Sequence, residues 1–135
     1  MVQGLGSGVK EVTSMAKGII CVVDDDRFFL QALVRLLRGA GLETVSFENP
    51  RLFLEYVKDH SVSLAIIDLR MPELSGLEVQ RRLYDIAPEV AVIIITGHES
   101  STDREVALAQ GAIAFLLKPI QRNELLDAVR KAIQL

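Results

Sequence analysis

Short apolar runs alternate with longer amphipathic stretches from residue 18 to the end of this 135-residue sequence. Four runs are almost continuously apolar, as is typical of strands that are buried on both faces of a parallel sheet. They span residues 19–23, 64–67, 91–95 and 112–117. A more polar run at 43–47 indicates an edge strand. Strand and helix therefore alternate five times, and each crossover is long enough for a right-handed βαβ unit.

The segments between the runs begin with residues that cap helices. These caps are Asp26, Asn49 followed by Pro50, Ser75 with Glu78, and Thr102 with Glu105. A fifth helix is expected from about 122 to 133. The pattern predicts an α/β fold of the (βα)5 doubly wound type. Its five parallel strands lie in the order 2-1-3-4-5, with helices on both faces of the sheet, as in flavodoxin-like folds.

Composition limits the function classes that remain open. A net charge of −3 argues against a basic nucleic-acid-binding surface, and a hydrophobic content of 50% excludes disorder over most of the length. Residues 1–17 are interpreted as a flexible leader, either native or left by cloning, and 18–135 as one domain. No apolar run approaches the roughly 18 residues that span a bilayer. We expect a cytoplasmic protein, with the single Cys21 in the core of a reducing compartment.

Polar side chains follow four of the five predicted strands directly. The first strand leads into Asp24, Asp25 and Asp26, and another ends at Asp68. The carboxyl ends of parallel strands meet at one edge, so we expect Asp24, Asp25 and Asp68 to lie close together. Two unit charges about 4 Å apart repel by roughly 4 kcal/mol at an effective dielectric constant of 20. Such a cluster takes up protons or a cation, and oxygen-only ligands at a half-open site favour Mg²⁺.

The remaining strand ends provide a hydroxyl group and a cation. Thr96 ends the fourth strand and Lys118 follows the fifth. Each of these residues alone is commonplace at a strand end, but together with three acids they suit phosphoryl transfer. A carboxylate can attack phosphorus to give an acyl phosphate, and the surrounding groups neutralise charge on the phosphoryl oxygens. Asp68 is the better nucleophile candidate because it stands alone on a central strand.

Four motifs in order resemble the receiver domain of bacterial response regulators, the CheY-like superfamily. They are VVDDD at 22–26, IDLRMPELSG at 67–76, ITGH at 95–98 and FLLKP at 115–119. The resemblance covers about residues 18–135, and the motifs are most similar to receivers of the FixJ type. It implies a cytoplasmic two-component signalling switch. Such a switch is not an enzyme, although it assists its own phosphorylation and dephosphorylation.

The resemblance also implies roles for individual residues. Asp68 is expected to take a phosphoryl group from a sensor histidine kinase or a histidine phosphotransfer protein in a Mg²⁺-dependent reaction. By the family pattern, Asp25 and Asp68 bind the metal directly and Asp24 binds it through a water molecule. The backbone carbonyl of Arg70 is the third protein ligand.

Further positions match the family's phosphoryl-binding and switch residues. Lys118 is expected to pair with the phosphoryl group, and its bond to Pro119 to be cis. Thr96 and Phe115 match the switch pair, in which the hydroxyl moves toward the phosphoryl group and the aromatic ring fills the space it leaves. Phe115 has no hydroxyl group, so only its packing can signal.

The loops around Asp68 are expected to set access to it and the lifetime of the acyl phosphate. Gly97 leaves the approach open, and Arg70 and His98 match two variable positions that tune this lifetime. Gly76 is expected to permit close backbone approach in the loop after Asp68. The switch is expected to alter the surface of the fourth helix, fifth strand and fifth helix, residues 100–135. That change would control an output, with a homodimer as one outcome of phosphorylation.

Three other functions fit this sequence less well. A phosphatase-type hydrolase needs a second acid two residues after the nucleophile, where this chain has Arg70. A receiver that is never phosphorylated would not need the complete set of site residues. A flavodoxin-like cofactor binder would need a phosphate loop after the first strand. The chain is either a stand-alone regulator or the receiver of a longer transcriptional regulator, and no membrane or direct nucleic-acid contact is expected of it.

Overall fold

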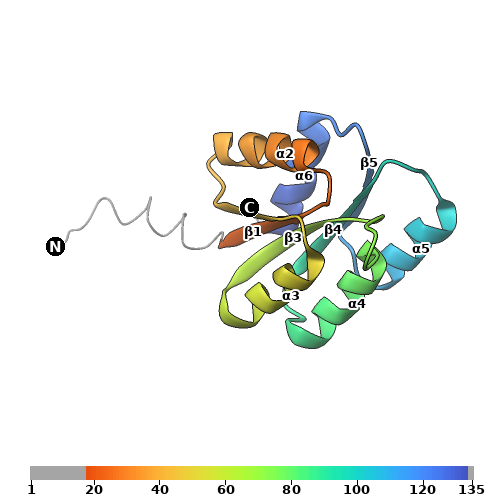
Figure 1. The fold of residues 1–135 in the computed structure, drawn as a ribbon. Helices are drawn as coiled ribbons and strands as arrows, with labels where there is room; N and C mark the ends of the chain where they lie inside the picture. Colours follow the sequence, from red (N-terminus) through yellow and green to blue (C-terminus); the bar gives the residue numbers. More distant parts are fainter. Residues whose placement is uncertain (1–17, 134–135) are drawn as a thin grey trace.

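Residues 18–133 are described by a computed structural model with five strands and five helices, labelled as in Figure 1. The strands are β1 (Ile19–Val23), β2 (Thr44–Phe47), β3 (Val62–Asp68), β4 (Ala91–Thr96) and β5 (Ala114–Leu117). The helices are α2 (Arg27–Gly39), α3 (Pro50–Asp59), α4 (Gly76–Ile86), α5 (Ser101–Ala109) and α6 (Arg122–Ala132). The predicted leader, residues 1–17, lies outside the described residues.

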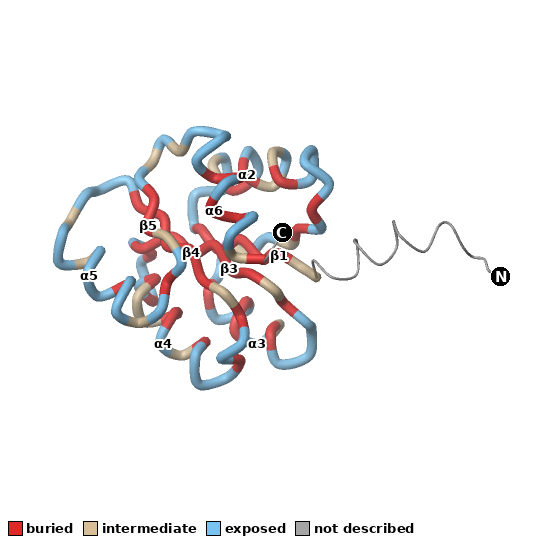
Figure 2. Tube along the Cα trace, turned by 180° about the vertical axis from the view of Figure 1, so that it is seen from behind, coloured by how far each residue is buried: buried red, intermediate tan, exposed pale blue. Residues whose placement is uncertain are grey.

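All neighbouring strands are parallel and lie in the order β2-β1-β3-β4-β5, which confirms the predicted topology. Helices α2 and α6 cover one face of the sheet, and α3, α4 and α5 cover the other (Figure 1). Alternate residues of the strands supply two separate cores. Val22 and Ile66 pack under α2 and α6, whereas Val23 and Ile67 face the three other helices. The central strands are therefore buried on both faces, as Figure 2 shows.

The caps explain where most helices begin. The Asp26 side chain accepts hydrogen bonds from the backbone N–H groups of Phe28 and Phe29, and Ser75 accepts one from Glu78. One predicted cap is wrong. Helix α5 begins at Ser101, and its cap is Ser100, whose hydroxyl accepts from the N–H of Asp103 rather than Thr102 pairing with Glu105. Ser100, Ser101 and Thr102 follow one another here, and both residue types can cap a helix.

The strand register brings the predicted site residues to one edge. Val23 pairs with Ile67 across β1 and β3, so Asp24, which follows β1, stands beside Asp68, the last residue of β3. Thr96 pairs with Leu117 across β4 and β5, and Thr96 accepts a backbone hydrogen bond from Lys118 at 2.8 Å. Among the helices of residues 18–133, none has the length and apolar character needed to span a bilayer.

Candidate functional site

Three carboxylates form the centre of the site. Asp24, Asp25 and Asp68 each place a carboxylate oxygen within 4.8 Å of the others. Asp24 and Asp68 are buried, whereas Asp25 is exposed. The predicted clustering at the carboxyl edge of the sheet is therefore present in the structure, with one acid accessible to solvent and two beneath it.

Lys118 lies between the two buried acids. Its Nζ donates to Asp24 Oδ2 at 2.8 Å and lies 3.2 Å from Asp68 Oδ1. The other oxygen of Asp24 accepts from the backbone N–H of Asp26 at 2.9 Å. The ammonium group also sits over the ring of Phe29, 4.1 Å from its centroid, a cation–π contact. The Lys118–Pro119 peptide bond is cis in the structure.

Burial and mutual repulsion shift how these groups ionise. Burial raises the pKa of Asp68 from 3.8 to about 6, and the charge of Asp24 adds to the rise while Lys118 opposes it. Burial also raises the pKa of Asp24, and its hydrogen bonds from Lys118 and the Asp26 N–H offset only part of that effect. For Lys118, burial acts to lower the pKa, but the hydrogen bond and attraction of Asp24 outweigh it and raise the pKa.

This arrangement fits a divalent cation. The three acids carry three negative charges when ionised against the single positive charge of Lys118, so the cluster keeps an excess of negative charge. All its ligands are oxygen atoms, which suits Mg²⁺. Asp25 lies at the edge of an open depression that Arg70 and Asp103 also line. Since both oxygens of Asp24 already accept hydrogen bonds, Asp25 and Asp68 are the acids with more freedom to bind an ion.

Thr96, Gly97 and His98 form the turn that leaves β4. Thr96 is fully buried, and its hydroxyl donates to the carbonyl of His98 at 3.3 Å and accepts from the His98 N–H at 3.2 Å. Both bonds are local and long, so the hydroxyl can exchange them for another partner. Gly97 is exposed, and a Cβ there would meet only the Lys118 side chain, at 4.0 Å. The exposed side of Gly97 therefore leaves open space.

Phe115 is buried in β5, 6% exposed, and has an arginine as neighbour. The guanidinium of Arg104 lies 5.8 Å from the ring centroid, and its Nη1 donates to the Phe115 carbonyl at 3.4 Å. Phe115 thus packs in the core while one face contacts helix α5. The structure places Thr96 and Phe115 on the adjacent strands β4 and β5.

The loop after Asp68 is held close to the strand end by Gly76. The Gly76 N–H donates to the Leu69 carbonyl at 2.7 Å. A Cβ at Gly76 would lie 2.8 Å from the Cα of Leu69 and would clash with the carbonyl oxygen of Asp68. Only glycine fits here without moving the backbone that carries the acid. The close backbone approach expected at this position is therefore required by the fold.

Two side chains near the site had no predicted role. Asp103, in the first turn of α5, pairs with Arg70 at 3.3 Å between Oδ2 and Nη2. Phe29, in the first turn of α2, contacts Lys118 with its ring. An acid in a helical first turn and an aromatic in an apolar stripe are ordinary features, so neither position gave a signal by itself. His98 is exposed, and only its backbone contacts Thr96 in the bonds above.

Comparison with known proteins gives consistent results. Residues 20–130 match the family described as response regulator receiver domain. Response regulator protein TodT of Pseudomonas putida is 36% identical over 129 residues, which are 96% of this chain and 56% of TodT. The chain thus spans little more than half of that relative.

Solved structures show the same fold. The crystal structure of FixJ-N is similar with a TM-score of 0.81 and 28% identity, covering 87% of this chain and 94% of that one. The solution structure of the beryllofluoride-activated NtrC4 receiver domain dimer is similar with a TM-score of 0.82 and 26% identity, covering 86% of this chain and 96% of that one.

Proposed function

The chain belongs to the family of response regulator receiver domains of two-component systems, and from this premise we propose that Asp68 is its phosphoryl acceptor. The observation that supports this most strongly is the Asp24–Asp68–Lys118 arrangement: a buried carboxylate with one lysine and two further acids around it. The family acts as a signalling switch rather than as a turnover catalyst. In that role the modified carboxylate is the product, and its lifetime sets the duration of the signal.

The proposed reaction transfers a phosphoryl group from a phosphohistidine of a sensor kinase or phosphotransfer protein. The P–N bond of the donor breaks, a P–O bond to the Asp68 carboxylate forms, and the released imidazole takes up a proton. Attack requires Asp68 to be ionised, and with a pKa of about 6 it is mostly ionised at neutral pH. Lys118 is already 3.2 Å from Asp68 Oδ1, so its ammonium is placed to neutralise an incoming phosphoryl oxygen. Gly97 leaves room for the donor.

Receiver domains bind Mg²⁺ at an acidic pocket, and we propose that Asp25 and Asp68 hold it here. Asp24 would act through a water molecule, and the backbone carbonyl of Arg70 would complete the protein ligands. When bound, the ion neutralises charge on the phosphoryl oxygens. The exposed position of Asp25 and the oxygen-only donor set support this assignment.

The proposed response moves Thr96 and Phe115. The Thr96 hydroxyl has only two long bonds to the neighbouring residue His98, and a phosphoryl oxygen offers a stronger, charged acceptor. Movement of Thr96 would leave space for Phe115 and change the surface of α5, β5 and α6. That surface exposes apolar side chains, which supports a role in self-association or partner docking. They are Val106, Leu108, Ile113 and Leu117.

The proposed partners are a histidine kinase or phosphotransfer protein on the input side and, on phosphorylation, a second copy of the chain. We place this exchange in the cytoplasm. The receiver occupies residues 18–135 in this proposal. It would control an output such as transcription within a longer regulator, in keeping with the 56% share of TodT that the chain spans. Phosphoryl lifetime would be tuned by Arg70, two residues after Asp68, and by His98, two residues after Thr96.

Intact mass measurement tests the acceptor directly. The chain is incubated with acetyl phosphate and MgCl₂, and wild type is compared with Asp68→Asn and Asp26→Asn. Asp26→Asn is a matched control, because it removes a neighbouring acid and an asparagine still caps α2. We expect wild type and Asp26→Asn to gain the mass of one phosphoryl group, with the gain abolished by EDTA. A phosphoryl group retained by Asp68→Asn would place the acceptor elsewhere and refute the proposal.

A further inference from the structure

Helix α5 is attached to the rest of the domain by very little apolar packing. Of its nine residues only Ala107 is buried, whereas α2 buries three residues and α3, α4 and α6 bury four each. Burial of apolar surface supplies most of the energy that holds a helix to its domain. Polar contacts must therefore account for an unusual share of what holds α5 in place.

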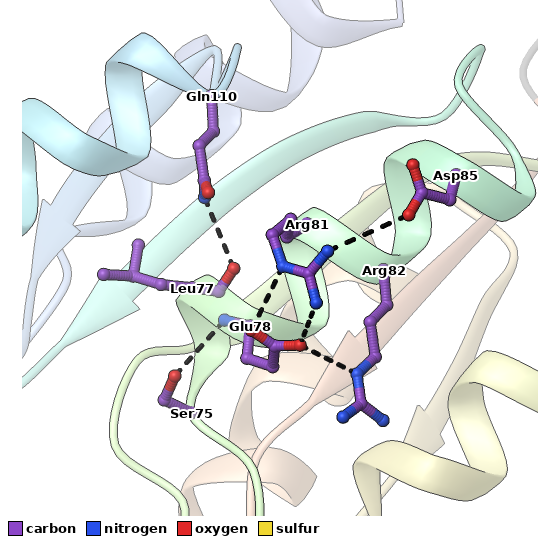
Figure 3. A network of polar contacts seen from close by, with 7 residues as sticks. All are labelled: Ser75, Leu77, Glu78, Arg81, Arg82, Asp85 and Gln110. Atoms are coloured by element: carbon purple, nitrogen blue, oxygen red, sulfur yellow. Dashed lines mark hydrogen bonds and ion pairs between the residues drawn. The ribbon is translucent and has the colours of Figure 1, made fainter.

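The C-terminal end of α5 is fixed to α4 by two glutamine side chains, Gln80, which is buried, and Gln110, which is half-buried. Gln80 is 2% exposed, and its Nε2 donates to the Ala107 carbonyl at 3.0 Å. Gln110, which follows α5, donates from Nε2 to Gln80 Oε1 at 2.8 Å and to the Leu77 carbonyl at 3.3 Å. Figure 3 shows Gln110 reaching down to Leu77 at the start of α4. Breaking these contacts would leave buried polar groups unpaired, so this end of α5 resists movement.

The N-terminal half of α5 is held differently, by two arginines at the surface. Arg70 pairs with Asp103 at 3.3 Å, and its side chain is 58% exposed. Arg104 reaches the Phe115 carbonyl at 3.4 Å. Exposed contacts of this kind are weak and exchange partners readily. Both arginines connect α5 to the site, because Arg70 lies two residues after Asp68 and Phe115 belongs to the proposed switch pair.

From these contacts we propose that Arg70 and Asp103 form a latch that phosphorylation opens, while Gln80 and Gln110 form the hinge about which α5 turns. This proposal rests on Asp68 being the phosphoryl acceptor. The new element is a second connection from the site to α5, separate from Thr96 and Phe115 and made by the arginine side chain itself. Arg70 acts in it as a positioning residue.

Arg70 should bind a phosphoryl group on Asp68 in preference to the Asp103 carboxylate. Arg70 and Asp103 line the same open depression as Asp25, and Arg70 lies two residues after Asp68 in the chain. A phosphoryl group on Asp68 brings between one and two negative charges and three acceptor oxygens at pH 7, against one carboxylate on Asp103. The planar guanidinium matches phosphate geometry with two parallel hydrogen bonds. Arg70 would therefore leave Asp103 for the phosphoryl oxygens.

The two arginines of α4 are engaged with acids of their own helix. Arg81 and Arg82 both bind Glu78 on their own helix, and Arg81 also lies 4.0 Å from Asp85 (Figure 3). These bonds hold the pKa of Glu78 at about 2, so its carboxylate stays ionised and keeps both partners over the working pH range. Once Arg70 leaves, Arg104 still reaches the Phe115 carbonyl, so the first turns of α5 are loosened rather than detached.

Residue-resolved amide hydrogen exchange tests the latch in the unphosphorylated chain. The Arg104 amide, bonded to the Ser100 carbonyl, reports on the latch end, and the Gln110 amide, bonded to the Val106 carbonyl, reports on the hinge end. We expect Arg70→Gln and Asp103→Asn each to speed exchange at Arg104 by roughly two- to fivefold, the effect of losing one partly exposed ion pair. The double variant should be no faster than either single variant, and exchange at Gln110 should be unchanged.

Two further variants separate a latch from general loosening. Glu105→Gln removes an acid from the same helix that forms no ion pair with any of residues 18–133, and should leave exchange at Arg104 unchanged. Gln110→Ala removes the hinge contacts and should speed exchange at Gln110 itself. A double variant whose effect is the sum of the two single effects would show that Arg70 and Asp103 act independently, and would overturn the latch.

The phosphorylation arm uses acetyl phosphate and MgCl₂, with intact mass reporting the fraction modified. We expect phosphorylated wild type to show faster exchange at Arg104, and phosphorylation to accelerate exchange there by a smaller factor in the double variant, where only the connection through Thr96 and Phe115 remains. Full modification with unchanged exchange at Arg104 would overturn the release of α5. Absence of modification would instead refute the proposed function and the release together, while the variants in the unphosphorylated chain still decide whether the pair holds α5.

Discussion

Replacing Asp68 by asparagine should stabilise the metal-free protein at neutral pH. The folded state raises the pKa of Asp68 from 3.8 to about 6, because burial and the charge of Asp24 disfavour the ionised carboxylate. A rise of that size corresponds to about 3 kcal/mol of unfavourable free energy once the group is ionised. The amide that replaces the carboxylate carries no charge, so Asp68→Asn should raise the free energy of unfolding by about 1 to 3 kcal/mol at neutral pH.

The sign of the pH dependence follows from proton binding. Between the unfolded and folded pKa values of Asp68 the folded state binds more protons, so wild-type stability falls as pH rises through this interval. The advantage of Asp68→Asn should therefore be greatest above pH 6 and drop to about one third of its full size at about pH 4.5. MgCl₂ should narrow the gap at neutral pH, because an ion bound at the three carboxylates stabilises folded wild type.

Urea unfolding in EDTA at about pH 4.5 and about pH 7.5, at fixed ionic strength, measures both quantities. Glu89→Gln serves as control, since it removes an exposed acid remote from the cluster and should change stability by less than about 0.5 kcal/mol at either pH. The reasoning is wrong if Asp68→Asn is no more stable than wild type at the higher pH. It is also wrong if the difference is the same at both pH values.

Three further predictions concern single side chains. Burial raises the pKa of Cys21 to about 12, so the native protein should resist iodoacetamide at about pH 8 and react only after unfolding in urea. Lys118→Met should lower the free energy of unfolding by about 2 to 4 kcal/mol at neutral pH, because the buried Asp24 carboxylate loses its ion-pair partner. The loss should be smaller at about pH 4.5, and urea unfolding at the two pH values measures the difference. Gly76→Ala should cost at least about 2 kcal/mol in the same assay because its Cβ meets backbone, whereas Gly39→Ala, with open space around it, should be neutral or slightly stabilising.

The amino-acid sequence by itself determined the architecture and the centre of the site. Apolar runs of strand length and helix caps define five βα units, and a parallel sheet brings the carboxyl ends of its strands to one edge. Asp24, Asp68, Thr96 and Lys118 each follow an apolar run directly. Their positions are therefore fixed by local sequence together with a topology that allows few alternatives.

Tertiary structure alone decided which side chains surround that centre. The partners Arg70 and Asp103 lie 33 residues apart, as do Leu77 and Gln110, and Lys118 lies against Phe29 across the sheet. Periodicity shows which face of a helix is apolar, but it does not reveal how far a neighbouring helix is shifted along its axis. That shift determines which long polar side chains meet between α4 and α5, because it depends on the packing of all side chains between them.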